Sequence, residues 1–365
     1  MKKTVRTIAV TGVAAAALAG AGSAVAAITG SGATFPRIVY ENWCRDSGLC
    51  TYTAKGSTGG IRDFINGVVD IAASDATLSQ EQLSELAAKR GGVTPLYFPT
   101  LLGAITVPVN VQGIQGNRIK LDGKVVGDIF AGAVTSWNDP SIARSNKGLS
   151  LPSAPITVCV RSDGSGTSFG FSRYLTKVSP TFKAKVNFGQ TPAWAAPNVI
   201  KQPGNAGVAN CVKSNQNSIG YVDLGDALNA GLTSYVTAVG RSDVVTKRVR
   251  RGGKLVRKRV RVTRYIRPTV ASISAAGNLR TIKPDLTIDF SASPAFGAYP
   301  ITITTWILAY SDYGKAGKRD SLDDVKRFLN YAYSAPAQGK LPSLGFAPLP
   351  SPIVAAAKKQ LATLK

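Results

Sequence analysis

Short apolar runs alternate with segments of helical periodicity along this chain. The run "GVVDIAAS" at 67–74 precedes "LSQEQLSELAAKRGG" at 78–92, and "PITVCVRS" at 155–162 precedes the segment that follows Gly166. Ser79 and Gln82 have the spacing of a helix capping box, and the glycine pair 91–92 marks the helix end. Strands that alternate with helices predict an α/β architecture.

A different pattern covers residues 247–267, which read "KRVRRGGKLVRKRVRVTRYIR" with eleven basic residues and no acidic one. Gly252-Gly253 suits the two-residue turn of a β-hairpin. Strand alternation then places Arg257, Arg259 and Arg261 on one face and valines on the other. This face predicts contact with a polyanion, such as an anionic envelope polymer, whereas the alternative is a solvated loop without a specific partner.

Composition narrows the class of protein. The 365 residues are 44% hydrophobic and 18% charged, which is globular, and the length favours two lobes. The chain contains no histidine. This excludes three kinds of site that depend on histidine: Ser-His-Asp hydrolase sites, histidine phosphotransfer sites and the usual zinc hydrolase sites. The signatures of nucleic-acid modules are also missing. We therefore expect no enzyme, no metal, no cofactor and no specific nucleic-acid partner.

The first 26 residues have the pattern of a secretory signal peptide. Lys2, Lys3 and Arg6 precede an uncharged stretch, and Ala24-Val25-Ala26 suits a small-residue cleavage site. A membrane anchor is the alternative, but the stretch is weakly apolar and no other run is long enough to span a bilayer. The region holds no cysteine for a lipid anchor. We expect export to a periplasm, the cell envelope or the extracellular space.

The four cysteines are an even number in a chain expected to be exported, which favours two disulfides. Cys44 and Cys50 enclose the short loop "RDSGL", so they can pair easily, and Cys159 then pairs with Cys211. A zinc site is the alternative, but the sequence has no C-x-x-C pair and no histidine.

Three glycine- and hydroxyl-rich loops precede segments of helical character. They are "TGSGATFPRIVYENWC" from Thr29, "KGSTGGIRDFINGVVD" from Lys55 and "RSDGSGTSFGFSRYL" from Arg161; in the first, Pro36 suits the first helical position. A helix start offers free N–H donors, and glycine permits close approach of a ligand. Each loop alone is explained by an N-cap, but together they predict a site for a small, multiply charged oxyanion. No P-loop motif is present.

Five motifs resemble the PstS family of phosphate-binding proteins, which serve Pst-type ABC importers. The motifs are "GSGATFP" (30–36), "KGSTGGIRDFINGVVDIAASDA" (55–76), "LDGKVVGDIFAGAVTSWNDPSIARSN" (121–146), "RSDGSGTSF" (161–169) and "YPITITTWIL" (299–308). The resemblance runs along nearly the whole chain after the signal and departs only at the basic hairpin.

This resemblance implies the type II periplasmic-binding-protein fold, in which two α/β lobes are joined by two crossing strands. Lobe I would comprise residues 27–107 and 300–365. Lobe II would comprise residues 108–299, with the basic hairpin inserted at about 246–267. The crossings would be "GAITVPVN" and "YPITITT".

The resemblance also implies a ligand set, which consists of Thr34, Phe35, Ser57, Asp75, Arg161, Ser165, Gly166 and Thr167, with Asp163 orienting Arg161. Arg161 supplies charge and forked donors, and the hydroxyls and backbone N–H groups supply further donors. Asp75 would accept the proton of monohydrogen phosphate. Sulfate carries no such proton, so Asp75 would repel it.

We therefore expect an exported, monomeric solute-binding protein that captures phosphate between its lobes and delivers it to the permease subunits of an ABC importer. An alternative is an envelope protein that contacts polyanions through the basic hairpin. A phosphatase that uses one serine-rich loop as nucleophile is a further alternative, but it lacks a histidine base and an evident carboxylate metal cluster.

Overall fold

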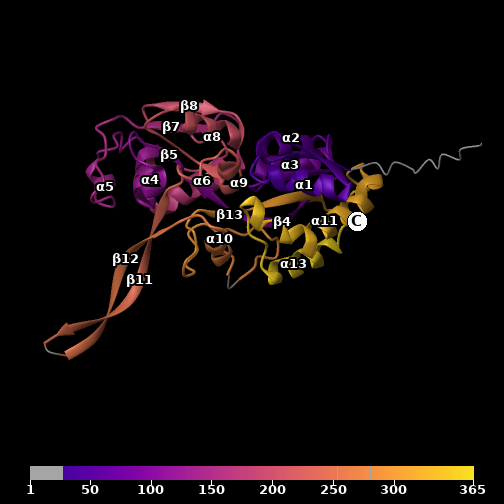
Figure 1. Ribbon diagram of the computed structural model, residues 1–365. Helices are drawn as coiled ribbons and strands as arrows, with labels where there is room; N and C mark the ends of the chain where they lie inside the picture. Colours follow the sequence, from indigo (N-terminus) through magenta and orange to yellow (C-terminus); the bar gives the residue numbers. More distant parts are fainter. Residues whose placement is uncertain (1–27, 253, 279–280) are drawn as a thin grey trace, which may run out of the picture.

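The computed structural model describes residues 28–252, 254–278 and 281–365. The expected signal peptide at 1–26 lies outside them. A six-stranded mixed sheet has the order β10-β4-β13-β3-β1-β2, a four-stranded sheet has the order β5-β9-β7-β8, and β12-β11-β6 form a third. Figure 1 shows β7, β8 and α8 on one side of the body and α1 to α3 on the other.

The six-stranded sheet comprises β1 (Ile28–Gly32), β2 (Cys50–Ala54), β3 (Ile71–Ser74), β4 (Pro95–Thr106), β10 (Val222–Asp223) and β13 (Thr302–Tyr310). The α-helices of these parts of the chain are α1 (Arg37–Ser47), α2 (Ser57–Ile65), α3 (Gln80–Lys89), α11 (Leu322–Ala332), α12 (Ala335–Gly339) and α13 (Ser351–Leu361). Short 3-10 turns are η2 (Arg319–Ser321) and η3 (Pro342–Leu344). β3 and β13 are buried along their whole length, as expected of strands covered on both faces.

The central part of the chain contributes the four-stranded sheet of β5 (Val109–Asn110), β7 (Thr157–Arg161), β8 (Val199–Gln202) and β9 (Ser218–Gly220). Its helices are η1 (Gly116–Arg118), α4 (Gly123–Phe130), α5 (Pro140–Ala143), α6 (Gly166–Val178), α7 (Pro180–Lys185), α8 (Gly204–Ser214) and α9 (Leu224–Asn229). The third sheet joins β6 (Lys120–Asp122) to β11 (Ala238–Arg251) and β12 (Lys254–Ile266), and α10 (Val270–Ala276) follows.

Local sequence signals place several elements correctly. Ser79 and Gln82 form both bonds of the capping box at the start of α3, and β3 and β7 fall within the two predicted apolar runs. The prediction that Pro36 is the first helical residue was wrong by one residue. Pro36 is the N-cap of α1, with a non-helical ψ of 7°, because its carbonyl already accepts the first helical N–H groups, from Val39 and Tyr40.

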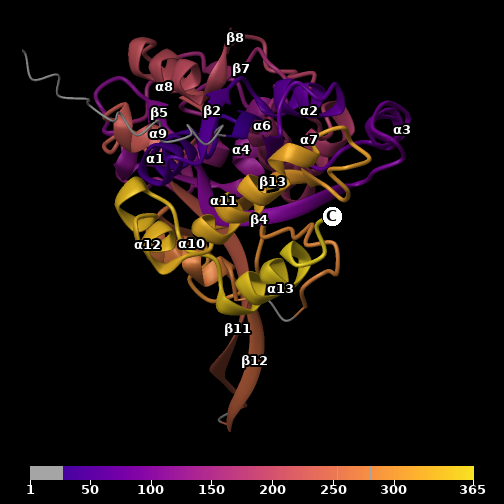
Figure 2. The same cartoon turned by 90° about the vertical axis from the view of Figure 1, so that its right-hand side faces the viewer.

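The segment from α10 to Pro300 packs against the six-stranded sheet. Trp306 Nε1 on β13 donates to the carbonyl of Leu286 at 2.9 Å, and the Tyr299 hydroxyl donates to the carbonyl of Ile105 on β4 at 3.1 Å. Figure 2 shows α10 and α13 on the same side of β4. This segment therefore contacts the sheet of the first part of the chain, although it follows the central part in sequence.

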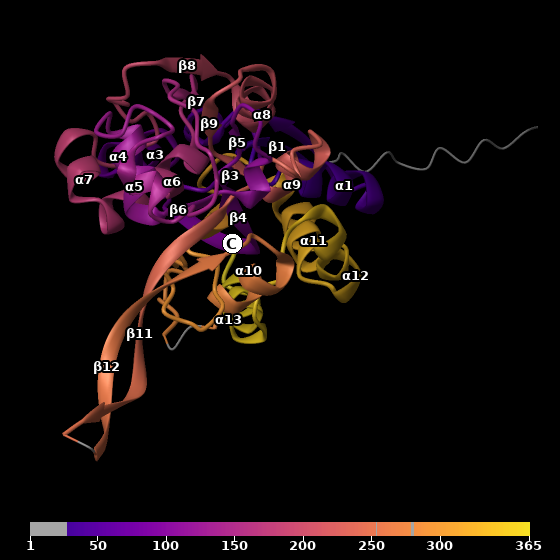
Figure 3. The ribbon, with the colours of Figure 1, turned by 60° about the vertical axis from the view of Figure 1, so that its left-hand side comes forward.

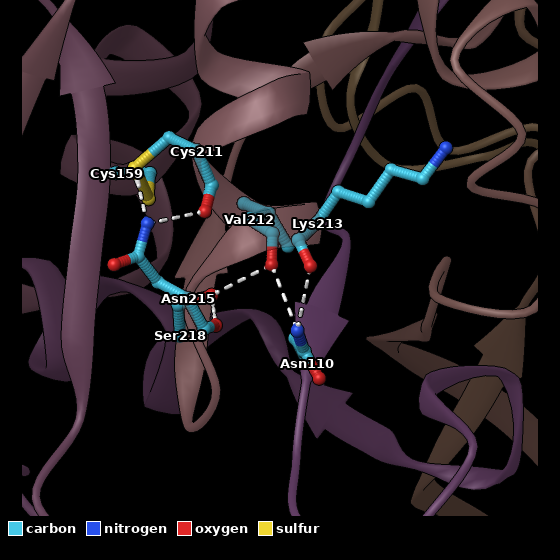
Figure 4. Close-up of a disulfide and its surroundings, with 7 residues drawn as sticks. All are labelled: Asn110, Cys159, Cys211, Val212, Lys213, Asn215 and Ser218. Atoms are coloured by element: carbon cyan, nitrogen blue, oxygen red, sulfur yellow. Dashed lines mark hydrogen bonds between the residues drawn. A yellow bond between two sulfur atoms is a disulfide. The ribbon is translucent and has the colours of Figure 1, made fainter.

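Both predicted disulfides are confirmed, Cys44–Cys50 and Cys159–Cys211. The second joins β7 to α8, whose C-terminal turn is further held by side chains (Figure 4). Asn110 on β5 donates to the carbonyls of Val212 and Lys213 at 3.0 and 3.1 Å. The disulfide and these bonds fix α8 against the sheet, so its N-terminal end has a fixed position.

The basic hairpin is a long two-stranded arm that extends from the body (Figure 3). β11 and β12 pair from Val239 with Ile266 to Arg251 with Lys254, which leaves two turn residues. Gly252 has a φ of 55°, and Gly253 lies outside the described residues. The hairpin begins before the expected position near 246, because β11 first pairs with β6 at the edge of the body.

Candidate functional site

The three predicted loops meet, and a fourth loop joins them. The N–H of Thr58 on α2 donates to the carbonyl of Gly164, just before α6, at 3.2 Å, and the N–H of Gly166 donates to Ser57 Oγ at 3.0 Å. The fourth loop precedes α8, where a Cβ on Gly204 would lie 3.6 Å from Thr34 Cγ2. The starts of α1, α2, α6 and α8 therefore surround one small volume, toward which helix N-termini direct N–H donors.

Glycine is required where these loops touch. Gly56 has a φ of 84°, and a Cβ there would lie 2.4 Å from Asp163 Oδ2. A Cβ on Gly166 would lie 2.4 Å from Ser57 Oγ. A side chain at either position would force the loops apart, so these glycines permit backbone from two sides to reach the same volume.

Arg161 is the cation at this place, at the end of β7, and its side chain is 1% exposed. Its Nε donates to Asp163 Oδ1 at 2.7 Å, a second N–H contacts Asp163 Oδ2, and its remaining terminal nitrogen donates to Asn205 Oδ1 at 2.7 Å. Burial by itself raises the pKa of Asp163, but the hydrogen bond and charge of Arg161 hold this pKa below its ordinary value. Asp163 is therefore ionised and keeps the guanidinium in one orientation.

Asp75 is a buried carboxylate directly after β3. Thr167 Oγ1 donates to its Oδ2 at 3.4 Å, whereas Oδ1 is buried without a hydrogen-bond partner among the described residues. Burial raises the pKa of Asp75 to about 7, although hydrogen bonds from Thr305 and Thr167 and the charge of Arg161 oppose this rise. The Oγ1 atom of Thr34 is likewise buried and unpartnered. An unsatisfied buried polar atom costs about 1–3 kcal/mol, so both atoms are suited to a further partner.

The remaining predicted residues lie around these atoms. Ser57 Oγ accepts from the N–H groups of Gly166 and Asp75, at 3.0 and 3.3 Å, which leaves its own proton to donate. Ser165 is the N-cap of α6, where its Oγ accepts from the N–H of Ser168 at 3.0 Å. Phe35 is buried, and its ring packs edge-on against Phe346. The structure thus brings all eight predicted ligand residues together, with the N–H of Gly166 turned toward Ser57.

Sequence reasoning missed three buried residues that support the site. Asn205 accepts from Arg161 and donates to Thr167 Oγ1 and to Asp223 Oδ2, at 3.3 and 2.7 Å. The Tyr221 hydroxyl accepts from the backbone N–H of Arg161 at 3.1 Å, and burial raises the pKa of Tyr221 to about 12. Burial and then the neighbouring Asp226 raise the pKa of Asp223 well above its ordinary value. The glycine turn "PGNAG" at 203–207 is the signal that could have indicated Asn205.

Contacts between distant parts of the chain close the site. Arg37 on α1 forms a salt bridge with Asp226 on α9 at 2.9 Å, and Thr58 Oγ1 donates to Gln190 at 2.7 Å. Because Asp226 accepts from Arg37 and its N–H donates to Asp223, hydrogen bonds run continuously from Arg161 through Asn205 and Asp223 to Arg37. A hollow of about 800 Å³ lies elsewhere, at the base of the arm.

The described residues contain no group of three or more His, Cys, Asp or Glu side chains that could hold a metal ion. They also contain no helix with the length and apolar character needed to cross a bilayer.

Comparison with known proteins places the chain in a family. The sequence model of the PBP superfamily domain matches residues 10–336. The phosphate-binding protein PstS of Xylella fastidiosa is 30% identical over 333 residues, which are 89% of this chain and 82% of the relative. The PstS of Haemophilus influenzae is 30% identical over 342 residues, which are 91% and 92% of the two chains.

Solved structures agree on the fold. A high affinity periplasmic phosphate-binding protein, solved with bound phosphate, superposes on this chain with a TM-score of 0.71 at 22% identity. The superposition covers 91% of this chain and 93% of that protein. The phosphate binding protein of Stenotrophomonas maltophilia gives a TM-score of 0.65 at 22% identity, with the same coverage. The mixed α/β architecture is that of type II periplasmic binding proteins. The chain belongs to the PstS family of phosphate-binding proteins, within the PBP superfamily.

Proposed function

We propose that this protein captures inorganic phosphate between the four helix starts and delivers it to the permease of an ABC importer. One observation carries the proposal. Beside the buried Arg161, two buried polar atoms from other elements, Thr34 Oγ1 and Asp75 Oδ1, have no hydrogen-bond partner among the described residues. A cation, a free hydroxyl donor and a free carboxylate acceptor together suit an oxyanion that still carries a proton.

Asp75 gives this site its selectivity. Monohydrogen phosphate can donate its proton to Asp75 Oδ1, which satisfies both groups. Sulfate has no such proton, so above pH 7, where Asp75 is ionised, the same oxygen would face a sulfate lone pair at short range without water. Relatives and solved neighbours named as phosphate-binding proteins support phosphate as the ligand.

The proposed phosphate ligands are Thr34, Phe35, Ser57, Asp75, Arg161, Ser165, Gly166 and Thr167, with Asp163 as the positioning residue for Arg161. Phosphate has five heavy atoms, so at about 1.5 kcal/mol per atom at best, its binding free energy reaches ~7.5 kcal/mol. A Kd on the order of micromolar therefore requires nearly every one of these contacts. The small, sealed volume at the helix starts is consistent with that requirement.

The sequence-based lobes are residues 28–107 with 300–365, and residues 108–299, but β10 and the segment from α10 to Pro300 belong with the six-stranded sheet of the first lobe. The site lies between them, since Thr34, Ser57 and Asp75 come from the first lobe and Arg161 to Thr167 from the second. Opening about the two crossing strands would expose the site, and the permease would distinguish loaded from empty protein by shape. Export fits this role. We propose that the mature protein is a monomer in a periplasm or cell envelope and that it carries no lipid anchor at the cleavage site.

Isothermal titration of mature protein, stripped of phosphate, tests the proposal. At pH 8, we expect one phosphate per chain, with a Kd near micromolar, and no heat from sulfate. We also expect no hydrolysis of a chromogenic phosphate ester, which separates a binding protein from a phosphatase. Absence of heat and of any thermal stabilisation by phosphate would contradict the assignment.

A second candidate function concerns the arm. We propose that it contacts an anionic polymer of the cell envelope. Seven of its cationic side chains are exposed and have no acidic partner within 4 Å in the part that the structure describes: Lys247, Arg248, Arg250, Arg257, Lys258, Arg259 and Arg261. Deleting 247–267 should abolish salt-sensitive retention on an anionic matrix and leave phosphate binding intact. Equal retention of both proteins would refute the contact.

A further inference from the structure

A hollow of about 800 Å³ lies at the base of the arm, away from the phosphate site. One wall is formed by β11 and β12, and the opposite wall by the start of α4, the end of α6 and the loop 292–300. Its charged lining consists of Lys124, Lys177, Arg241, Arg261 and Arg264 against Asp122 and Asp243. The lining therefore carries more positive than negative charge.

Phe296 stands at this hollow with 78% of its surface exposed, the largest value among the exposed large apolar side chains of the described residues. The guanidinium of Arg264 lies 4.7 Å from the centre of its ring. Phe296 thus presents an aromatic ring to the solvent beside a cation, which is an arrangement that can stack against an apolar ligand face.

Arg241 fixes the two walls of the hollow relative to each other. Its Nε donates to Asp243 Oδ1 at 2.7 Å, and a terminal nitrogen donates to the carbonyl of Ala295 at 2.8 Å. The sequence Arg241-Ser242-Asp243 repeats the residues of Arg161-Ser162-Asp163, and both pairs have the same Nε to Oδ1 distance of 2.7 Å. The loop that carries Phe296 is thus held against the arm.

The two carboxylates in the lining are already occupied. Asp243 also pairs with Arg264 at 3.3 Å, and Asp122 accepts from the Tyr265 hydroxyl at 2.7 Å. Lys124 and Lys177 pair with Asp128 and Asp289, outside the lining. The lining carboxylates are therefore compensated by neighbouring donors, and Arg261, an exposed cation without an acidic partner, faces the same space.

Arg261 also begins the cationic row of the arm. Arg259 and Arg257 follow on the same face at intervals of about 6.6 Å, the distance between alternate strand residues. Arg248 pairs directly with Arg257 across the hairpin. Like charges directly opposite each other destabilise a sheet, so an anionic chain along this face would relieve their repulsion. Arg261 therefore belongs both to the hollow and to the row.

We propose that the hollow binds one sugar unit of an anionic polysaccharide of the cell envelope, and that the following units run along the arm. The apolar face of the sugar ring would stack on Phe296, and Arg261 would contact its anionic group. A polysaccharide fits better than a single-stranded nucleic acid, which needs successive stacking platforms along its path. This inference rests on the proposed contact between the arm and a polyanion.

Fluorescence anisotropy with labelled polymers, in saturating phosphate, tests the hollow. Inorganic polyphosphate supplies charge without a ring, and dextran sulfate supplies charge with sugar rings. At one salt concentration, we expect dextran sulfate to bind about three- to tenfold more tightly per charge, the range of one aromatic stacking contact. Phe296→Ala should remove this preference and leave polyphosphate binding unchanged.

Phe188→Ala is the matched control, since Phe188 is also exposed, at 49%, and does not line the hollow. A preference for dextran sulfate that survives Phe296→Ala would overturn the inference, as would tighter binding of a single-stranded oligonucleotide. The triple variant Arg257→Ser, Arg259→Ser, Arg261→Ser should weaken binding of both polymers. If the unmodified protein binds neither polymer, the contact of the arm with polyanions fails too, whereas phosphate titration reports separately on the main proposal.

Discussion

Replacing Asp75 by asparagine changes the ligand preference of the proposed site more than its affinity for phosphate. Thr167 Oγ1 holds one carboxylate oxygen of Asp75 at 3.4 Å, so the other, unpartnered atom faces the site in the wild type. At pH 8, above the pKa of about 7, this atom is ionised. Asparagine keeps the shape but removes the charge and adds an N–H donor.

The expected magnitudes follow from this change. The charge of Asp75 repels both ligands, since phosphate and sulfate are both dianions at pH 8, so its removal favours both of them. Phosphate alone also loses the hydrogen bond that it donates to Asp75. A hydrogen bond to a charged acceptor contributes about 1.5–3 kcal/mol and one to a neutral acceptor about half as much, so the ratio of phosphate to sulfate affinity should fall about tenfold.

Isothermal titration of both anions at pH 8, with wild type and Asp75→Asn, measures the two changes. Asp128→Asn is the matched control, because Asp128 is also buried but accepts from Ser179 far from the site. We expect the control to keep the wild-type ratio of phosphate to sulfate affinity. If Asp75→Asn also keeps that ratio, the acceptor explanation of selectivity is wrong, even if phosphate binds.

Three further predictions concern stability and closure. In phosphate-free protein, burial raises the pKa of Asp75 from 3.8 to about 7. The protonated group therefore contributes its full stabilisation below pH 4, and this stabilisation is lost as the pH rises to 7. The free energy of unfolding of wild type relative to Asp75→Asn should thus fall by about 4 kcal/mol over this range in urea titrations; a constant difference would refute the raised pKa. Replacing Cys159 and Cys211 together by serine opens a loop with a sequence separation of 52 and should lower the free energy of unfolding by about 4 kcal/mol, whereas an unchanged urea midpoint would contradict this. Arg37→Ala removes the partly exposed salt bridge to Asp226 and should speed phosphate release by up to about fivefold in stopped flow; an unchanged release rate would show that this contact does not hold the site closed.

Local chemistry explains which features the sequence could predict. The capping box of α3 is formed by neighbouring residues, and the short loop between Cys44 and Cys50 makes that disulfide easy. The glycine pair and the alternation after it predicted the hairpin. The loops of the proposed site could be selected from the sequence because glycine, serine and threonine suit positions where backbone and hydroxyl donors approach an anion.

Other features depended on residues far apart in the chain. Arg37 and Asp226 are 189 positions apart, and no local pattern indicates that they meet. Asn205 was not singled out in the sequence, but it is buried near the start of α8 and bonds both Arg161 and Asp223. The hollow beside Phe296 exists only because the loop 292–300 folds back onto the base of the arm.

The sequence by itself determined the α/β architecture, the disulfide pairs, the hairpin and the loops of the proposed anion site, because each depends on residue types within short segments. Only the tertiary structure decided that four rather than three helix starts meet, that Thr34 and Asp75 each present an unpartnered atom there, and that the pKa of Asp75 rises to about 7. These properties depend on desolvation by distant parts of the chain, which no single segment encodes.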